Sequence, residues 1–261
     1  LFKNFIKSLS SFFIKVYAQK KIKIVLDDKA FRTKTDAYGG FTLVYNNHLQ
    51  NSDISITTSD GEELEVAQSY PSFFRKTKGE IDVISDVDDT IVISYTKNIF
   101  KRISSILFTP PRKRRPIGFT QNLLNAFDKK NARVHYISKS ESNLFAMLTS
   151  IIQLNNLPNG NLILTSYLKF RQLFNPKKGH DYKLNQIRFI IKNTKDKSYI
   201  LIGDDTQKDM ETYAKIVKKF PDKILKVYIR QTKSKVRTYQ KIMLNNLKDT
   251  GVDHLYFNDD S

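Results

Sequence analysis

Two patterns of hydrophobic and polar positions divide the chain near residue 79. Between about residues 20 and 70, short runs alternate between apolar and polar positions, and they lie at 21–25, 41–45 and 53–57. Turn-forming pairs such as Asp27-Asp28 and Asp60-Gly61 separate these runs. Alternation with a period of two between frequent turns is typical of short antiparallel strands. The pattern predicts a small β-rich, sandwich-like domain over residues 20–78.

Beyond residue 79, apolar runs alternate with amphipathic segments. The runs predict strands at 81–85, 133–138, 199–203 and 224–230, and the amphipathic segments predict helices at 119–129, 143–154, 184–192 and 207–220. Strands that alternate with helices indicate right-handed crossovers in an α/β fold. We therefore expect residues 79–261 to form one α/β domain, with a mostly parallel sheet covered by helices on both faces.

The first 19 residues show a third pattern. Apolar side chains recur at helical spacing, including Phe2, Phe5, Leu9 and Phe12, and lysine and small polar residues fill the other side. This predicts an amphipathic helix, which either lies on an anionic membrane or packs on the protein's own core; the pattern leaves both open. No apolar stretch approaches the roughly 18–20 residues that cross a bilayer, so we expect no integral membrane segment.

Composition restricts the chemistry that the chain can perform. There is no Cys, and the four His, at 48, 135, 180 and 254, show no paired ligand spacing. Disulfides, Cys nucleophiles and thiolate metal sites are therefore excluded, and the His spacing argues against a zinc site. Any bound metal should be a hard ion that carboxylate oxygens hold.

The net charge is +18 and is unevenly distributed. Residues 1–80 carry 12 basic and 9 acidic side chains, and the rest of the chain carries 32 and 17. A basic field attracts nucleic acid, anionic membranes or phosphorylated substrates, and charge alone does not choose among these partners. The alternative is that most of these lysines only solvate the surface.

Polar side chains follow several of the predicted strands. Asp86 and Asp88 come directly after the first α/β strand, within an Asp-x-Asp-x-Thr sequence that ends at Thr90. Because parallel strands gather their carboxyl ends on one edge of a sheet, these residues should lie near the other candidates. The other candidates are Ser138, Lys183, Asp204 and Asp205. Together the set offers a carboxylate nucleophile, a second carboxyl for proton transfer, a hydroxyl, a cation and acids to hold Mg²⁺, which predicts phosphoryl transfer.

Each candidate also has an ordinary structural interpretation. An isolated Asp-x-Asp is common in turns, where carboxylates accept backbone N–H groups. Ser138 alone would be a strand-end hydroxyl, Lys183 alone a solvated lysine, and Asp209 would be favoured near a helix amino terminus by the dipole. Lys177 and Lys178 compete with Lys183 for the role of the cation.

These segments, in this order and strand context, resemble the four motifs of the haloacid dehalogenase superfamily. A narrower resemblance joins residues 83–91, 135–140, 202–209 and 227–230 to the catalytic domain of the phosphatidate phosphatase family whose yeast member is associated with actin patches. It covers roughly residues 80–232. Two departures are Glu141, where the family usually has Pro after its Ser-x-Ser, and Asp205, where it usually has Ser. They leave the catalytic groups intact and the substrate open.

The resemblance implies a role for each candidate. Asp86 would attack phosphorus and form an aspartyl phosphate, and Asp88 would act as general acid and then as general base. Asp86, Asp88 and Asp204 would hold Mg²⁺. The expected phosphate-binding residues are Ser138, Lys183 and, in support of the loop, Thr90; Asp205 and Asp209 are candidates for contact with the metal or its ligands.

The segment between Thr90 and Phe119 bears on the substrate. Its basic residues, which we take as candidates for lipid or membrane contact, are Lys101, Arg102, Arg112, Lys113, Arg114 and Arg115. Basic and apolar side chains at the mouth of a site would suit a phosphomonoester at a lipid surface. The alternative is that the arginines are solvated and the apolar residues pack inward.

We therefore expect a Mg²⁺-dependent phosphatase, with phosphatidate or a related lipid phosphate as the favoured substrate. The protein would act in the cytoplasm, with peripheral contact to anionic membranes as an option. One alternative is a phosphatase of nucleotides, nucleic-acid ends or phosphoproteins. Another is a non-catalytic membrane or cytoskeletal adaptor. Nucleic acid is disfavoured as a partner because no recognised binding motif accompanies the basic runs.

Overall fold

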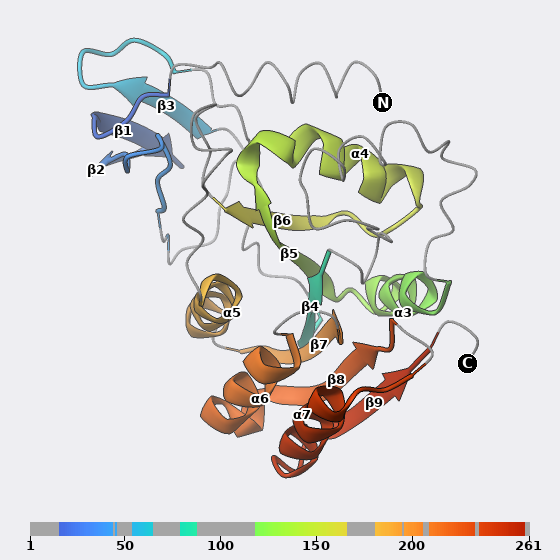
Figure 1. Cartoon of the computed structure of the whole chain (residues 1–261). Coiled ribbons are helices and arrows are strands. Elements are labelled where there is room, and N and C mark those ends of the chain that lie inside the picture. The colour runs from blue at the N-terminus through green and yellow to red at the C-terminus, as the bar shows by residue number, and fades with distance from the viewer. Residues whose placement is uncertain are drawn as a thin grey trace.

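The structure of the chain is a computed structural model. It describes residues 16–43, 45, 54–64, 79–87, 118–165, 181–194, 196–205, 209–232 and 235–258, apart from the side chains at 143 and 147. Within these ranges the strands form two sheets, one of three strands and one of six (Figure 1). The amphipathic helix expected at 1–19 falls mostly outside the described residues.

The smaller sheet is antiparallel. It contains β1 (Lys21–Leu26), β2 (Lys29–Lys34) and β3 (Ile54–Thr58) in the order β2-β1-β3. Ile22, Ile24 and Ile56 are buried in its small core, which explains the alternation in the sequence. Asp27 and Asp28 join β1 to β2 with φ values of 48° and 61°, the left-handed pair that suits a tight hairpin. The predicted small antiparallel sheet is confirmed.

The strands of this sheet differ from the expectation at one point. Phe41 to Leu43 belong to no strand, whereas β2, which the pattern did not predict, pairs with β1. The Asp36 carboxylate accepts backbone N–H groups from Tyr38, at 2.7 Å, and Gly40, at 2.8 Å. This turn separates residues 41–43 from the hairpin. The apolar side chains of Phe41 and Leu43 therefore do not belong to a strand, contrary to the prediction.

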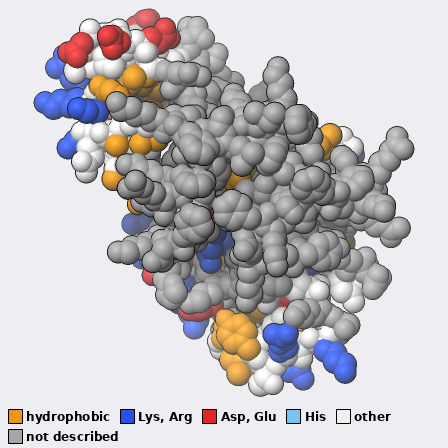
Figure 2. All heavy atoms as spheres, turned by 45° about the horizontal axis from the view of Figure 1, so that its top comes forward, with side chains coloured by type: hydrophobic (Ala, Val, Ile, Leu, Met, Phe, Trp, Pro, Cys, Tyr) orange, Lys and Arg blue, Asp and Glu red, His pale blue; other side chains and the backbone are white. Residues whose placement is uncertain are grey.

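The surface of the small sheet carries both signs of charge. The turn after β3 exposes Asp60, Glu62 and Glu63, and β1 and β2 expose lysines. In Figure 2 acidic side chains gather at the upper end of the molecule, with Lys and Arg side chains beside them.

The larger sheet is parallel at every pairing of neighbouring strands among the described residues. Its strands are β4 (Ile81–Asp86), β5 (Arg133–Glu141), β6 (Gly160–Thr165), β7 (Ser198–Asp204), β8 (Ile224–Arg230) and β9 (Asp253–Phe257). The spatial order is β6-β5-β4-β7-β8-β9. Counted along the chain, this is the doubly wound order 3-2-1-4-5-6, which reverses between β4 and β7. Such a reversal opens a crevice at the carboxyl ends of the two strands.

Helices cover both faces of this sheet (Figure 1). On one face lie α3 (Gly118–Lys129) and α4 (Phe145–Leu154), which follows the short 3-10 turn η2 (Ser142–Leu144). On the other lie α5 (Tyr182–Asn193), α6 (Asp209–Lys219) and α7 (Thr238–Lys248), and the 3-10 turn η4 (Pro221–Lys223) precedes β8. The predicted α/β fold is confirmed, although β6, α7 and β9 were not predicted.

Each face of the sheet has its own core. Successive strand residues point to opposite faces, so Val83 packs with α3 and α4, whereas Ile84 packs with α5 and α6. Burial on both faces explains why β4 and β7 read as continuous apolar runs. None of the helices in the described ranges is long and apolar enough to cross a bilayer.

Candidate active site

Asp86 ends the central strand β4 at the point where the strand order reverses. It is 1% exposed, and the buried residues Val83 and Ile84 fix the strand beneath it. In the parallel register Asp86 is paired with Ile137 of β5, and Ser85 with Ile202 of β7. Ser138 directly follows Ile137, and Asp204 lies two residues after Ile202, so both lie at the same edge of the sheet as Asp86.

Three carboxylates meet at this edge. Asp204 is the last residue of β7, Asp209 is the first residue of α6, and both are fully buried. One carboxylate oxygen from each of Asp86, Asp204 and Asp209 lies within 4.8 Å of the other two. The amino terminus of α6 favours a negative charge at Asp209 through the helix dipole.

Lys183 brings a positive charge into the acidic cluster. It is the second residue of α5, not part of the preceding loop, and its ammonium Nζ lies 2.6 Å from Asp86 Oδ1 and 2.5 Å from Asp209 Oδ1. Burial by itself would lower the pKa of Lys183, but the charges of Asp209 and Asp86 outweigh it and raise that pKa. Lys183 is therefore charged at neutral pH and holds two carboxylates in place.

The cluster fits a hard divalent cation. Three carboxylates and one ammonium leave the described part of the cluster with an excess of negative charge. Asp209 Oδ2 is buried and makes no hydrogen bond to any described residue. Carboxylate oxygens are the ligands that Mg²⁺ and similar ions prefer, so Asp86, Asp204 and Asp209 could hold such an ion.

Gly203 permits the close approach of these groups. A Cβ atom at this position would lie 2.8 Å from Tyr213 Cε2 and 3.0 Å from Asp209 Oδ2. The Tyr213 hydroxyl donates to the Ile202 carbonyl at 2.8 Å, and burial, followed by the nearby carboxylates, raises the pKa of Tyr213 well above its ordinary value. Gly203 and Tyr213 thus shape the site without offering it a reactive group.

Asp205 faces away from the acidic cluster. Its Oδ1 accepts hydrogen bonds from the backbone N–H and the hydroxyl of Thr232, at 3.1 and 2.6 Å. Its Oδ2 accepts one from the Tyr256 hydroxyl at 2.6 Å, and its carbonyl accepts one from Gln240 Nε2 at 3.2 Å. Asp205 therefore joins the end of β7 to the segment after β8, to α7 and to β9.

Ser138 lies within β5 and not at its end. The strand continues to Glu141, and its register with β6 shifts between Ile137 and Glu141. Ser138 is fully buried, and its Oγ accepts the backbone N–H of Ser140 at 2.9 Å. Such irregular positions commonly re-aim side chains beside functional sites.

The remaining predicted site residues fall outside the described residues. They are Asp88 and Thr90 of the first motif and the basic residues Lys101, Arg102, Arg112, Lys113, Arg114 and Arg115. The competing cations Lys177 and Lys178 lie outside as well.

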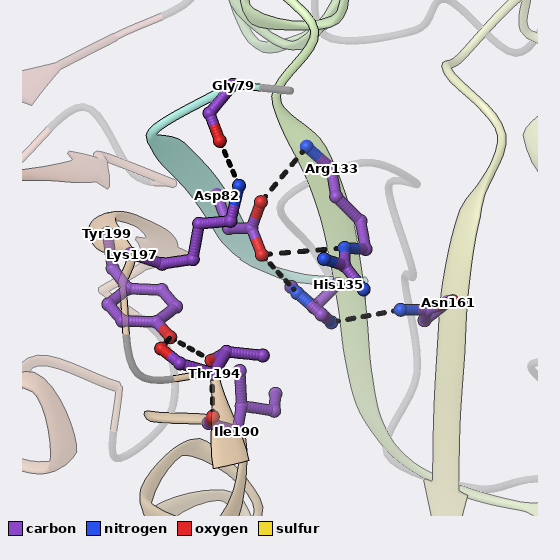
Figure 3. Close-up of polar contacts among 9 residues, drawn as sticks. All are labelled: Gly79, Asp82, Arg133, His135, Asn161, Ile190, Thr194, Lys197 and Tyr199. Carbon is purple, nitrogen blue, oxygen red and sulfur yellow. Dashed lines mark hydrogen bonds and ion pairs between the residues drawn. The ribbon is translucent and has the colours of Figure 1, made fainter. Parts of the chain in front are cut away.

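A second buried carboxylate, Asp82, lies near the amino end of β4 (Figure 3). Its Oδ2 is 3.2 Å from His135 Nε2 and 3.5 Å from Arg133 Nε, and its Oδ1 accepts the backbone N–H of Arg133 at 3.3 Å. The Asn161 amide Nδ2 lies 3.2 Å from His135 Nδ1. Because Nδ2 is a donor, His135 Nδ1 must accept, which places the proton of a neutral imidazole on Nε2, facing Asp82.

The pKa directions agree with this arrangement. Burial lowers the pKa of His135 below its ordinary value, although Asp82 opposes the change. For Asp82, burial alone would raise the pKa, but the hydrogen bond from His135 and the charge of Arg133 lower it overall. Sequence reasoning did not single out this network; its signal was an acid near the start of a predicted apolar strand.

Comparison with known proteins connects the described site to one family. Residues 81–231 match the family model described as the catalytic domain of the phosphatidate phosphatase APP1. In an alignment of 242 residues that covers 88% of the chain, it is 26% identical to phosphatidate phosphatase APP1 of Saccharomyces cerevisiae. Over 156 residues, or 59% of its length, it is 24% identical to an uncharacterized protein of Schizosaccharomyces pombe. The matches span only 40% and 26% of these relatives.

Solved structures show weaker similarity. A chain in the structure of the Pnkp1/Rnl/Hen1 complex matches 81% of this chain and 57% of its own length, with a TM-score of 0.39 and 11% identity. Cytosolic 5′-nucleotidase IIIB bound to cytidine matches 69% of this chain and 81% of its own length, with a TM-score of 0.38 and 12% identity.

Proposed function

The chain belongs to the family of APP1 phosphatidate phosphatase catalytic domains, and we propose that it is a Mg²⁺-dependent phosphatase that acts on phosphatidate or a related lipid phosphate. The observation that supports this most is the buried cluster of Asp86, Asp204 and Asp209 with Lys183, where the strand order reverses. The family relationship supports the lipid substrate.

In the proposed reaction, a carboxylate oxygen of Asp86 attacks phosphorus. A P–O bond to Asp86 forms while the ester P–O bond breaks, and Asp88 gives its proton to the departing alkoxide. Water then attacks the aspartyl phosphate, Asp88 takes a proton from that water, and phosphate leaves with Asp86 restored. The ion pair of Lys183 with Asp86 keeps the nucleophile ionised and oriented.

Asp86, Asp204 and Asp209 are the described residues that would hold the metal ion. When bound, Mg²⁺ would neutralise phosphoryl oxygens that otherwise repel the anionic nucleophile. Lys183 and Ser138 lie at the same edge as candidates to bind the remaining phosphoryl oxygens.

The test of substrate class measures phosphate release from phosphatidate vesicles, lysophosphatidate, nucleotides, phosphorylated DNA ends and phosphopeptides, with Mg²⁺ or with EDTA. Asp86→Asn is compared in every assay with Asp222→Asn, the same change at an exposed residue. We expect Mg²⁺-dependent release from phosphatidate that only Asp86→Asn abolishes. Release from soluble substrates alone would overturn the lipid assignment, and no release from any substrate would favour the adaptor.

Metal binding has a test that needs no turnover. Mg²⁺ should raise the thermal unfolding midpoint, because a ligand at about 100 times its Kd stabilises the native state by about 2.7 kcal/mol. Asp204→Asn should reduce this stabilisation, whereas Asp222→Asn should retain it. An equal stabilisation of all three proteins would place the ion elsewhere.

A further inference from the structure

The outward side of α7 combines apolar and basic side chains. Tyr239 and Ile242 are 49% and 51% exposed, and residues three apart are neighbours on a helix. The opposite side of the helix is buried through Gln240 and Leu247. The two apolar side chains therefore face solvent on a helix that is already packed in place.

The segment that carries this surface is basic up to Asp249, which directly follows the helix. Residues 231–248 contain five Lys or Arg and no Asp or Glu. Among them Lys235, Arg237 and Lys241 are exposed. The neighbouring helix α6 differs, since its Lys215 pairs with Glu211 at 2.7 Å. The small sheet differs as well, because acidic and basic side chains lie together on it (Figure 2).

The surface lies at the same edge of the sheet as the acidic cluster. Gln240, in the first turn of α7, donates its Nε2 hydrogen to the carbonyl of Asp205 at 3.2 Å. Asp205 directly follows Asp204, a member of the cluster. The exposed residues around Gln240 are thus near the carboxyl ends of the strands, where a substrate would enter.

We propose that Lys235, Arg237, Tyr239, Lys241 and Ile242, here called the α7 surface, dock the protein on an anionic membrane. Cations that lie near an anionic bilayer each strengthen its binding. Ile242 can enter the boundary between headgroups and acyl chains, and tyrosine is favoured at that depth. Docking at this surface would turn the catalytic edge of the sheet toward a lipid substrate. This consequence rests on the proposed function, whereas the docking itself does not.

Charge and chemistry disfavour other occupants. A second copy would bring the same cations against the α7 surface, which like charges oppose. Nucleic acid would meet the cations, and a base could stack on Tyr239, but the exposed aliphatic Ile242 suits the apolar boundary of a bilayer better than a base.

A local fluorescence measurement tests the docking. The chain contains no Trp, so Tyr239→Trp introduces a single reporter into the full chain, and Leu154→Trp, at a position that is 52% exposed on α4, is the matched control. Brominated phosphatidylcholine vesicles are prepared with and without phosphatidylserine. We expect a blue shift and quenching only for Tyr239→Trp and only with phosphatidylserine. Equal responses of both variants, or none from either, would overturn the proposal, even if other segments bind the vesicles.

Charge reversal provides the second measurement. Lys235→Glu with Lys241→Glu should weaken co-sedimentation with phosphatidylserine vesicles about tenfold or more, whereas Lys218→Glu with Lys219→Glu on α6 should have a smaller effect. If both double variants weakened vesicle binding equally, the α7 surface would act only through the net charge of the protein, and the proposal would be overturned. A change in oligomeric mass, or in RNA binding with vesicle binding intact, would assign the surface to another partner.

Hydrolysis of a soluble phosphomonoester separates the two proposals. It should be unchanged in the Lys235→Glu, Lys241→Glu protein. If neither wild type nor variant hydrolyses any substrate while the vesicle results hold, the proposed function fails and the docking stands.

Discussion

The two ends of strand β4 each carry a buried aspartate, and their surroundings differ in charge balance. At the amino end, Asp82 meets the Arg133 guanidinium and the neutral imidazole of His135. At the carboxyl end, Asp86 shares one ammonium, that of Lys183, with another carboxylate, that of Asp209. Both side chains are almost inaccessible to solvent.

We take this difference to separate a structural acid from the proposed nucleophile. A buried carboxylate whose charge is matched contributes to strand pairing, and removing it leaves its partners unpaired. A buried carboxylate among like charges, in contrast, is suited to bind a cation. Burial is the same at both ends of β4, so the balance of charges around each carboxylate is what distinguishes the end that we propose to be catalytic.

The largest expected effect is on activity and comes from Asp86→Asn. Loss of the nucleophile should lower kcat on phosphatidate at least about a thousandfold. The free energy of unfolding should be unchanged or higher, because repulsion from Asp209 and Asp204 decreases. Phosphate release and urea unfolding measure the two quantities. Full activity in the variant would remove Asp86 from the proposed mechanism.

The same substitution at the other end should reverse the pattern. Asp82→Asn leaves Arg133 buried without its counter-charge, so we expect a loss of about 3–5 kcal/mol in the free energy of unfolding. Activity per folded molecule should remain close to that of wild type, as measured at low temperature and normalised by the native fraction from circular dichroism. A stable but inactive variant would contradict the division of roles between the two ends.

Gly203→Ala tests how tightly the reactive end is packed. The new methyl group must displace Tyr213 or Asp209, so overpacking should cost about 1–3 kcal/mol and lower kcat as well. Gly118→Ala is the matched control, since a Cβ there meets nothing within 4 Å. If both variants unfold at the same urea concentration, the packing at Gly203 is looser than described.

The smallest expected effect is a pH dependence of stability at the amino end. Folding lowers the pKa of His135, so the unfolded chain takes up a proton first as pH falls below the ordinary value of 6.5. Stability from this group is complete above that pH and decreases below it, by at most about 1.4 kcal/mol per pH unit. Folding also lowers the pKa of Asp82, so the stability that Asp82 contributes begins to decrease only when the pH falls below its ordinary pKa of 3.8.

Urea unfolding at a series of pH values checks this expectation. In His135→Gln the free energy of unfolding should depend less on pH just below pH 6.5, because the titrating group is absent. The variant should also be less stable than wild type at neutral pH. An unchanged slope in that variant would assign the titration to other groups.

The parts of the fold that the sequence predicted are those buried on both faces of the sheet. β4, β5, β7 and β8 contain apolar runs, because helices cover both sides of them. β9 was missed because it is an edge strand, and three of its five residues are polar or exposed. α7 was missed because a buried glutamine, Gln240, interrupts its apolar stripe.

Within the candidate site, the sequence identified the residue types but not their orientation. Asp205 and Asp209 were equal candidates for metal contact, and the fold brings Asp209 into the acidic cluster while it turns Asp205 toward Tyr256. That choice depends on a partner 51 residues away, which no local pattern reveals. The Asp82 network was hidden for the same reason, since its partners belong to β5 and β6.

The hydrogen bond between Asp205 and Tyr256 has a consequence for the order of events during protein synthesis. A ribosome produces Asp86 before Tyr256, so Asp205 lacks its hydrogen bond from β9 until residue 256 has left the exit tunnel. A nascent chain that has already assembled β4, β5 and β7 would therefore hold its carboxylates in an unfinished arrangement. Competence for chemistry should arrive abruptly, with the addition of β9 to the sheet.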